Sequence, residues 1–488
     1  MASRRGAPPQ GVADHAREAL DGIFGQRYPA STLRGIRTPL VPAQNHVPFA
    51  GLVHPDSLDS GAYGGMSLVW FPVPGDETGS PVSLLTFVCG TRGLAPDDQI
   101  LGRPGHARHL HALRRYLANR CGVRIWTKHD PANLSQALPQ QVRDELFRFK
   151  AALDQYGHFI YAAVEVPRDE RAREVTAAFL DYYAWERGWR PLAAIAAEVE
   201  GFRNALRTFL FPRVTRDDLM SLLRERRFVV LQGPPGTGKT RLAGELLREG
   251  FSGRGRVVQF HPAVTYETFV AGLSPDVKDA ALRFDVKPGW LVEANREASK
   301  PENSDYLLVV DEINRGDLGR VLGEAIYLFE PRDITDGVGR TVHLPHPLED
   351  GSDTLTLSQG LYVLGTMNTA DRSIAILDMA VRRRFAFVDV WPDAEVVNAQ
   401  GLELATKAFG LLQDIFAQYA PDDALTLLPG HAYFLAKTHE ELVRRLRFEL
   451  LPLLREYLQE GRLGPCESEL RAYSDWLEGE ISRDAPEA

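Results

Sequence analysis

The residues from Gly233 to Thr240 read GPPGTGKT, a spacing of glycine, lysine and threonine that suits phosphate chemistry. The stretch matches G-x-x-x-x-G-K-[ST], and it lies between an apolar run, FVVLQ, and a helical pattern that begins at Lys239. Glycines let backbone N–H groups turn inward around phosphate oxygens, and the helix N-terminus adds the positive end of its dipole. Lys239 would place its charge on the β- and γ-phosphates, and the Thr240 hydroxyl would coordinate Mg²⁺. The predicted nucleotide-binding residues are Gly233, Pro234, Pro235, Gly236, Thr237, Gly238, Lys239, Thr240 and Arg241.

Two adjacent acids, Asp311 and Glu312, follow four apolar residues in the stretch LLVVDEINR (residues 307–315). A buried strand that ends in carboxylates places them at the ligand crevice of a parallel sheet. We predict that Asp311 holds Mg²⁺ through water, and that Glu312 polarises the attacking water. A strand followed by a solvated turn would give the same local pattern, but the phosphate loop in the same chain disfavours that interpretation.

A third polar stretch, GTMNTADRSIAILDMAVRRRFAFVDV, covers residues 365–390. Asn368 ends a predicted strand and would lie beside the two acids, where its amide would orient the attacking water or the γ-phosphate. Three arginines, Arg382, Arg383 and Arg384, follow a helical pattern and precede another apolar strand. They are either a solvated helix end or an arginine finger that reaches the nucleotide of a neighbouring subunit.

The elements that would position these residues alternate between strand and helix. Apolar, β-branched runs recur at residues 228–232, 256–262, 306–312, 361–368 and 384–390, with helical patterns between them. This alternation indicates an α/β fold, with a parallel P-loop sheet that is covered by helices on both faces. We predict four parts: a mixed α/β recognition domain over residues 1–190, a helical connector over 191–214, the P-loop domain over 215–392 and a helical lid over 393–488.

The N-terminal part shows no recognisable catalytic motif. One of its helical patterns, residues 106–120, carries His106, His109 and His111, together with nearby arginines at positions 103, 108, 114 and 115. Metal binding is disfavoured, because no cysteine or acid pair accompanies the histidines. A basic face that contacts DNA and a solvated amphipathic helix both stay open, and the amphipathic helix is favoured.

Length, composition and charge limit the classes of protein to which the chain can belong. The chain has 488 residues, too many for one hydrophobic core, and its 44% apolar and 25% charged residues are ordinary for a globular protein. A net charge of −9 confines any nucleic-acid site to a local patch. Three cysteines without disulfide or metal spacing, and no apolar run of membrane-spanning or leader type, predict a cytoplasmic protein that does not bind a membrane.

In order and spacing, GPPGTGKT, DEINR, MNTADRS and RRRF resemble the AAA+ NTPases of the McrB type. These are the motor subunits of methylation-dependent McrBC restriction systems. The resemblance covers about residues 215–460, where the stretch PGHAYFL at 429–435 agrees as well. His431 of this stretch is shared with the family, and its role is left open. The resemblance does not extend to the first 200 residues.

The resemblance implies roles for further residues. In the family, MNTADRS is the signature of the first sensor, so Asn368 and Asp371 carry that catalytic role over. Among the three adjacent arginines, Arg383 and Arg384 are favoured as the arginine finger, and Arg382 is not excluded.

The resemblance also implies a function. The family hydrolyses GTP rather than ATP, assembles as a hexameric ring and is stimulated by an McrC-type nuclease. We therefore expect Mg²⁺ as cofactor, GTP or ATP as substrate, and a nuclease partner in restriction or phage defence, on DNA recognised by the N-terminal domain. The alternative is a MoxR-like AAA+ ATPase whose N-terminal region grips a protein. The P-loop does not read the base, so its residues leave GTP and ATP open.

Overall fold

The computed structural model describes residues 10–29, 47–54, 57, 63–73, 82–278, 281–303, 305–370 and 379–483. The chain divides into two compact units. The first unit comprises Met1–Leu210, Asp414–Asp422 and Leu463–Glu469, and the second comprises Phe211–Gln413, Asp423–Arg462 and Leu470–Ala488. The boundaries expected at residues 190, 214 and 392 stay predictions.

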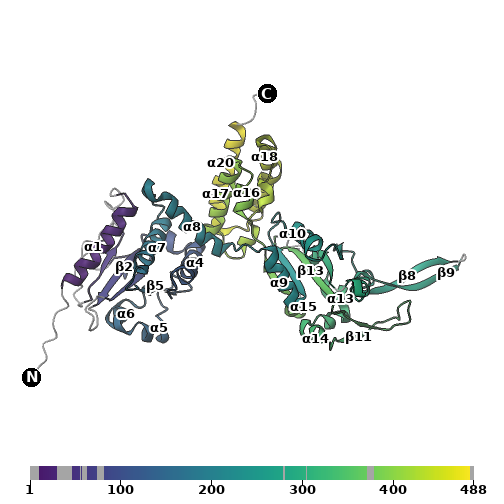
Figure 1. The fold of residues 1–488 in the computed structure, drawn as a ribbon. Coiled ribbons are helices and arrows are strands. Elements are labelled where there is room, and N and C mark those ends of the chain that lie inside the picture. The colour runs from purple at the N-terminus through teal and green to yellow at the C-terminus, as the bar shows by residue number, and fades with distance from the viewer. Residues whose placement is uncertain are drawn as a thin grey trace, which may run out of the picture. The chain divides into compact units, whose positions relative to one another are not determined.

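The first unit is built on an antiparallel sheet with the strand order β1-β2-β3-β5-β4 (Figure 1). Its strands are β1 (Ala50–Leu52), β2 (Met66–Val73), β3 (Val82–Cys89), β4 (Trp126–Thr127) and β5 (Ile160–Glu165). Its helices are α1 (Gln10–Arg27), α3 (Asp98–Leu101), α4 (Pro104–Cys121), α5 (Gln140–Glu145), α6 (Lys150–Tyr156), α7 (Arg171–Glu186) and α8 (Ala196–Leu210). The prediction of a mixed α/β N-terminal part is confirmed.

The strands of the first unit are apolar on both faces. Along β2, Leu68 and Trp70 enter one hydrophobic core, whereas Val69 and Phe71 enter another. Successive side chains of a strand point to opposite faces, so the continuous apolar run SLVWFPV indicates a sheet that is covered on both sides. The helices α4 and α7 supply most of the partners on the first of these faces.

The second unit contains a five-stranded parallel sheet with the order β14-β6-β13-β10-β7. Its strands are β6 (Phe228–Gly233), β7 (Gly255–Gln259), β10 (Tyr306–Asp311), β13 (Leu361–Asn368) and β14 (Ala386–Asp389). Along β6, Phe228 and Val230 enter one core, and Val229 and Leu231 enter the core on the opposite face. The predicted parallel sheet, covered on both faces, is therefore confirmed.

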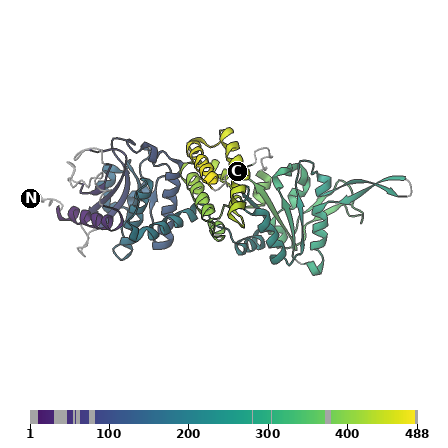
Figure 2. The same cartoon turned by 90° about the horizontal axis from the view of Figure 1, so that it is seen from above.

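Short helices and two hairpins complete this part of the second unit. The helices are α9 (Arg216–Arg226), α10 (Lys239–Glu245), α11 (Tyr266–Phe269), α12 (Trp290–Ala298), α13 (Leu318–Leu322), α14 (Pro331–Thr335) and α15 (Met379–Arg384). Two antiparallel hairpins, β8 (Ala271–Lys278) with β9 (Ala281–Pro288) and β11 (Thr341–His343) with β12 (Thr354–Thr356), were not expected from the sequence. Both views show the β8–β9 hairpin projecting away from the five-stranded sheet (Figures 1 and 2).

The C-terminal part is helical, as predicted. Its helices are α16 (Ala394–Asn398), α17 (Glu403–Tyr419), α18 (His439–Arg445), α19 (Leu451–Gln459) and α20 (Glu467–Arg483). After residue 390 the described residues form no strand. In the part of the chain that the structure describes, no helix is both long enough and apolar enough to cross a bilayer.

Candidate active site

The parallel register of the second sheet brings three sequence motifs to one edge. Strand β6 ends at Gly233, β10 at Asp311 and β13 at Asn368. Asn368 is paired with Gly233, and β10 lies on the other side of β13. The carboxyl ends of adjacent parallel strands form the crevice in which α/β proteins bind ligands. The structure therefore gathers the predicted phosphate loop, the two acids and Asn368 at one place.

The phosphate loop depends on glycines at three positions. Gly233, Gly236 and Gly238 have φ angles of 154°, 78° and 79°, which side-chain-bearing residues rarely adopt. A Cβ added to Gly233 would lie 2.3 Å from the carbonyl oxygen of Val390, so the close approach of β14 also excludes a side chain there. The loop leads into α10, which begins at Lys239 as predicted and continues as a π-helical turn over Leu246–Gly250.

Lys239 is buried and is held by the loop itself. Its Nζ donates to the carbonyl oxygens of Gly233 at 3.0 Å and of Pro234 at 2.7 Å. Burial lowers the pKa of Lys239 to about 8, although the carboxylates of Glu312 and Asp311 act in the opposite direction. A cation with little access to water interacts strongly with a nearby phosphate, because the effective dielectric constant is low.

Asp311 is positioned by two threonine hydroxyls. Thr240 Oγ1 donates to Asp311 Oδ1 at 2.9 Å, and Thr366 Oγ1 donates to the same oxygen at 2.6 Å. The sequence predictions missed Thr366, although it lies two residues before Asn368 and therefore on the same face of β13. Thr240 and Asp311 offer the hard oxygen ligands that Mg²⁺ prefers, so the donor set fits that ion. The described residues contain no group of three or more His, Cys, Asp or Glu suited to a metal, and Mg²⁺ needs none when phosphates and water complete its shell.

Glu312 lies directly beside Asn368. Asn368 Nδ2 donates to Glu312 Oε1 at 2.6 Å, and Asn314 Nδ2 donates to the carbonyl oxygen of Asn368 at 3.1 Å. Glu312 has a φ of 53°, and its backbone N–H donates to Thr366 Oγ1 at 3.1 Å. A left-handed conformation is uncommon for glutamate and is kept only where neighbours impose it. Arg315 Nε lies 3.5 Å from Glu312 Oε2, so both carboxylate oxygens have polar neighbours.

The three predicted arginines lie at the opposite edge of the sheet from the phosphate loop. They end α15, and β14 starts at Ala386, after a single intervening residue. Strand β14 is parallel to β6, and its residues up to Asp389 extend about 13 Å towards the loop edge. Asp371, the second predicted sensor residue, lies outside the described residues.

Two of the three arginines have contacts within their own subunit. The guanidinium of Arg382 lies 5.3 Å from the ring centroid of Phe387, and Arg384 Nη1 donates to the carbonyl oxygen of Ala380 at 2.9 Å. Arg382 and Arg383 are exposed to solvent, whereas Arg384 is half-buried. Their exposure leaves the solvated helix end and the arginine finger as alternatives within one chain.

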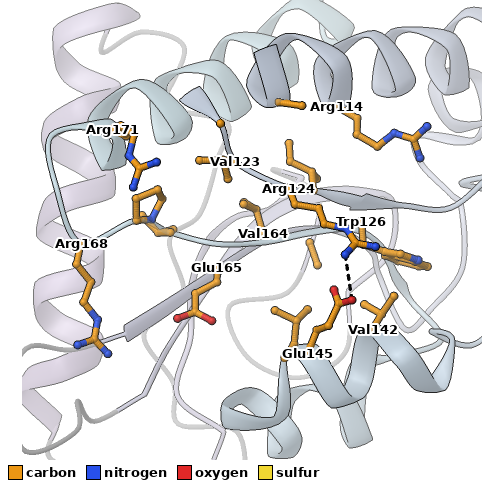
Figure 3. Close-up of a pocket in the computed structure, with 17 residues that line it drawn as sticks. Arg114, Val123, Arg124, Trp126, Val142, Glu145, Val164, Glu165, Arg168 and Arg171 are labelled. Carbon is orange, nitrogen blue, oxygen red and sulfur yellow. Dashed lines mark hydrogen bonds and ion pairs between the residues drawn. The ribbon is translucent and has the colours of Figure 1, made fainter. Parts of the chain in front are cut away.

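A second candidate site is an open pocket of about 770 Å³ in the first unit (Figure 3). It is bounded by the end of α4, the segment before β4, helix α5 and the chain between β5 and α7. Four arginines line it together with Trp126, two glutamates and an apolar floor that includes Val123 and Val164; the arginines are Arg114, Arg124, Arg168 and Arg171. The lining therefore has an excess of positive charge beside an aromatic ring.

The carboxylates of this pocket do not neutralise Arg114. Glu145 Oε1 accepts from Arg124 Nη1 at 3.1 Å, and Glu165 Oε1 accepts from Arg148 Nη1 at 3.3 Å. Among the described residues, no carboxylate lies within ion-pair distance of Arg114, which extends from α4 at one side of the pocket (Figure 3). This pocket provides a local positive patch on a protein of negative net charge.

The favoured interpretation of the histidine-rich helix was wrong for two of its residues. His106 and His109 are each 1% exposed, and their Nδ1 atoms lie 2.9 and 2.8 Å from the two carboxylate oxygens of Glu186. Arg103 Nη2 donates to the same carboxylate at 2.9 Å. Burial opposes ionisation of Glu186, but the two imidazoles hold its pKa well below the ordinary value. The acid that accompanies these histidines comes from α7, so the local sequence of α4 could not reveal it.

Residues 228–385 match the family model of the AAA domain, dynein-related subfamily. Over 209 residues the chain is 34% identical to the EcoKMcrB subunit of the type IV methyl-directed restriction enzyme of Escherichia coli K12, a match that covers 42% of this chain and 44% of the relative. Over 202 residues it is 24% identical to component YdiS of the type II restriction enzyme BsuMI of Bacillus subtilis 168, covering 35% of this chain and 57% of the relative. The chain thus spans about half the length of the curated relatives that it matches.

Among solved structures, NtrX from Brucella abortus is 13% identical, with coverage of 58% of this chain and 75% of NtrX and a TM-score of 0.25. NtrX in complex with ADP is also 13% identical. That match covers 46% of this chain and 47% of NtrX, with a TM-score of 0.23. The assignment therefore rests on the sequence matches and on the topology of the sheet. Residues 228–385 form an AAA domain of the P-loop NTPase class, related to McrB restriction subunits, as the motifs predicted.

Proposed function

We propose that this protein hydrolyses a nucleoside triphosphate with Mg²⁺ and acts as the motor subunit of a DNA-restriction complex. The observation that carries the proposal is the meeting of Lys239, Asp311 and Glu312 at the loop edge of one sheet, within a segment related to a restriction subunit. Each group has the charge and place that phosphoryl transfer to water requires.

Different residues of the site bind the nucleotide and accept the proton. Lys239 and the N–H groups of the loop would bind the phosphates, and Thr240 and Asp311, which are joined by a hydrogen bond, would hold the metal ion. When bound, Mg²⁺ would offset the negative charge that develops on the transferred phosphoryl group. Glu312 accepts a proton from the attacking water, and Asn368 fixes its carboxylate through the 2.6 Å hydrogen bond.

We favour GTP over ATP as the substrate, on the resemblance to the McrB type alone. The P-loop contacts phosphates and not the base, so the choice depends on groups elsewhere. The test measures phosphate release from GTP and from ATP with Mg²⁺, and competition between the two nucleotides for binding. Hydrolysis that disappears in Lys239→Ala supports the proposal. A purified wild-type protein that binds neither nucleotide would overturn it, and a clear preference for ATP would overturn the choice of GTP.

A ring with a nuclease partner is the second part of the proposal. The arginines of α15 lie at the opposite edge of the sheet from their own phosphate loop, so they would serve the site of a neighbouring subunit. A closed hexamer and an McrC-like nuclease follow from the family resemblance. The molecular mass in solution at saturating nucleotide tests whether the protein forms a ring. Stimulation of phosphate release by an added nuclease subunit tests whether that subunit is the partner.

We assign the DNA contact to the pocket of the first unit. Its arginines would neutralise backbone phosphates, and Trp126 offers a face on which a base could stack. Arg114→Ala should weaken DNA binding and reduce the slope of log affinity against log salt by about 1. Arg120→Ala is the matched control, because Arg120 is exposed on the same helix and pairs with Glu174 instead. Equal DNA affinity and salt slope in both variants would refute this assignment.

A further inference from the structure

A short segment between α17 and α18 is joined to the phosphate loop by backbone hydrogen bonds. Within this PGHAYF segment (residues 429–434), Gly430 N–H donates to the carbonyl oxygen of Pro235, and Ala432 N–H donates to that of Gly236, both at 3.0 Å. A Cβ on Gly430 would lie 2.0 Å from the carbonyl carbon of Gly236. The segment therefore needs glycine at this position in order to lie against the loop.

Two side chains of the PGHAYF segment lie against glycines of the loop. His431 Nε2 lies 3.6 Å from the position of a Cβ on Gly238, and the ring of Tyr433 lies 3.0 Å from that of a Cβ on Gly236. Because these glycines have no side chains, the imidazole and the phenol ring form one wall of the loop. Gly238 directly precedes Lys239, so the imidazole lies beside the phosphate-binding end of the loop.

The hydrogen bonds of His431 determine which of its nitrogens carries the proton. The backbone N–H of Asp393 donates to His431 Nδ1 at 3.2 Å. A backbone N–H can only donate, so Nδ1 is the acceptor and the proton of the neutral ring is on Nε2. Burial lowers the pKa of His431, which keeps the ring neutral near pH 7. Nε2–H is thus a hydrogen-bond donor on the side of Gly238, and the described residues offer it no acceptor.

The PGHAYF segment is also tied to the helices that follow it. Arg445 Nη1, from α18, donates to the carbonyl oxygens of Ala432 at 3.0 Å and of Leu435 at 2.7 Å. The amide of Gln400 donates from Nε2 to the carbonyl oxygen of Phe434 and accepts at Oε1 from the backbone N–H of Ala436. A contact made by His431 is therefore connected through few bonds to the C-terminal helices.

We propose that His431 is a nucleotide-binding residue, whose Nε2–H donates a hydrogen bond to a phosphate oxygen of the nucleotide in the loop. Phosphate oxygens are the strongest acceptors that a nucleotide presents to such a donor. The inference rests on the proposed function, since it needs a nucleotide at this loop. It adds a ligand from the C-terminal helical part to a site that is otherwise built from the sheet.

Two amide substitutions separate this role from a structural one. In His431→Gln the amide nitrogen takes the place of Nε2 and keeps the donor, whereas in His431→Asn the amide oxygen takes the place of Nδ1 and keeps the acceptor for Asp393. The measurement is the dissociation constant of a fluorescent, non-hydrolysable GTP analogue, repeated with the ATP analogue. We expect His431→Ala and His431→Asn to weaken binding about tenfold or more, and His431→Gln to stay within about threefold of wild type.

The opposite ranking would overturn the inference. If His431→Asn binds like wild type and His431→Gln does not, the ring serves only to accept from Asp393. Wild-type affinity in His431→Ala, or equal loss in all three variants, would also contradict a donor role. His439→Ala is the matched control, because His439 is exposed near the start of α18. A wild-type protein that binds neither analogue would instead overturn the proposed function itself.

Discussion

At the scale of single residues, the carboxylate of Asp311 is held in place from two sides. Thr240 reaches it from the start of α10 and Thr366 from the neighbouring strand, and both hydroxyls donate to Oδ1. Because the donors fix the orientation of Oδ1, the lone pairs of Thr240 and Asp311 are already directed before a cation binds. Such outer hydrogen bonds are known to tune metal affinity by holding ligands in place.

Thr366→Val should weaken the use of Mg²⁺ without removing a ligand. The substitution keeps the shape of the side chain and deletes both the donor to Asp311 and the acceptor of the Glu312 backbone N–H. We expect the Mg²⁺ concentration for half-maximal hydrolysis to rise about tenfold. A magnesium titration measures this, with Thr356→Val as control, because Thr356 is an exposed residue of strand β12. An unchanged titration in Thr366→Val would show that the second hydroxyl has no part in metal binding.

The lowered pKa of Lys239 predicts a pH dependence of nucleotide binding. The charged ammonium binds phosphate, so affinity should fall as the pH rises through about 8. The free energy of unfolding depends on pH in the opposite direction. The unfolded chain keeps this proton up to the ordinary pKa of 10.5, so the folded chain gains stability as the pH rises from about 8 to 10.5. Titrations between about pH 7 and about pH 9.5 measure the affinity. Lys239→Arg stays charged and should lose the dependence, and a flat wild-type profile would argue against the lowered pKa.

At the scale of elements, α4 and α7 are joined by a buried polar cluster. Glu186 of α7 accepts from Arg103 and contacts His106 and His109 of α4, beside the hydrophobic core that these helices share. One carboxylate thus contacts Arg103 and both imidazoles, whereas the buried Nε2 atoms of His106 and His109 find no hydrogen-bond partner among the described residues. Removing one partner of a buried charge cluster is costly, because the remaining charges lose both water and counter-charge.

Glu186→Ala should therefore destabilise the first unit by about 3 kcal/mol. Thermal melting of the full chain, followed by near-UV circular dichroism, measures the loss. Glu174→Ala is the control on the same helix, since its pair with Arg120 is exposed and screened by solvent, so its loss should change the melting temperature little. Equal effects of the two substitutions would show that the buried cluster does not stabilise the junction.

Prediction from sequence succeeded where the pattern is local. Strands β6, β10 and β13 are uninterrupted apolar runs that end in polar motifs, and their shared edge follows from parallel pairing. The β8–β9 hairpin was missed although β9 alternates apolar and charged residues in LRFDVK, because the glycine and the proline within β8 (AGLSPDVK) interrupt the pattern of its partner strand. Thr366 and Glu186 were missed for a different reason: each has its partner on another element, 55 residues away for Asp311 and 77 for His109.

At the scale of the whole molecule, we propose that the reaction uses residues from more than one chain. Each sheet presents its phosphate loop at one edge and its three arginines at the other. An arginine supplied by a neighbour would offset the charge on the transferred phosphoryl group. A ring in which every subunit is both donor and acceptor satisfies this arrangement.

Subunit mixing tests that arrangement. Arg383→Ala or Arg384→Ala should lower turnover with little effect on nucleotide affinity, and Lys239→Ala should abolish binding at its own site. Mixed assemblies of an arginine variant with Lys239→Ala should regain part of the activity, because one subunit supplies the finger and the other the pocket. A protein that stays monomeric at saturating nucleotide and hydrolyses at full rate would exclude a finger from a neighbour. So would mixtures without recovery despite proven co-assembly.

The most direct test of the account compares binding and turnover in Glu312→Gln. The amide keeps the shape of the side chain and loses the base, while Lys239, Thr240 and Asp311 remain to bind nucleotide and metal. Nucleotide affinity should stay close to that of wild type, and turnover should fall by about 100-fold or more. Hydrolysis by Glu312→Gln at the wild-type rate would contradict the assignment of the active site.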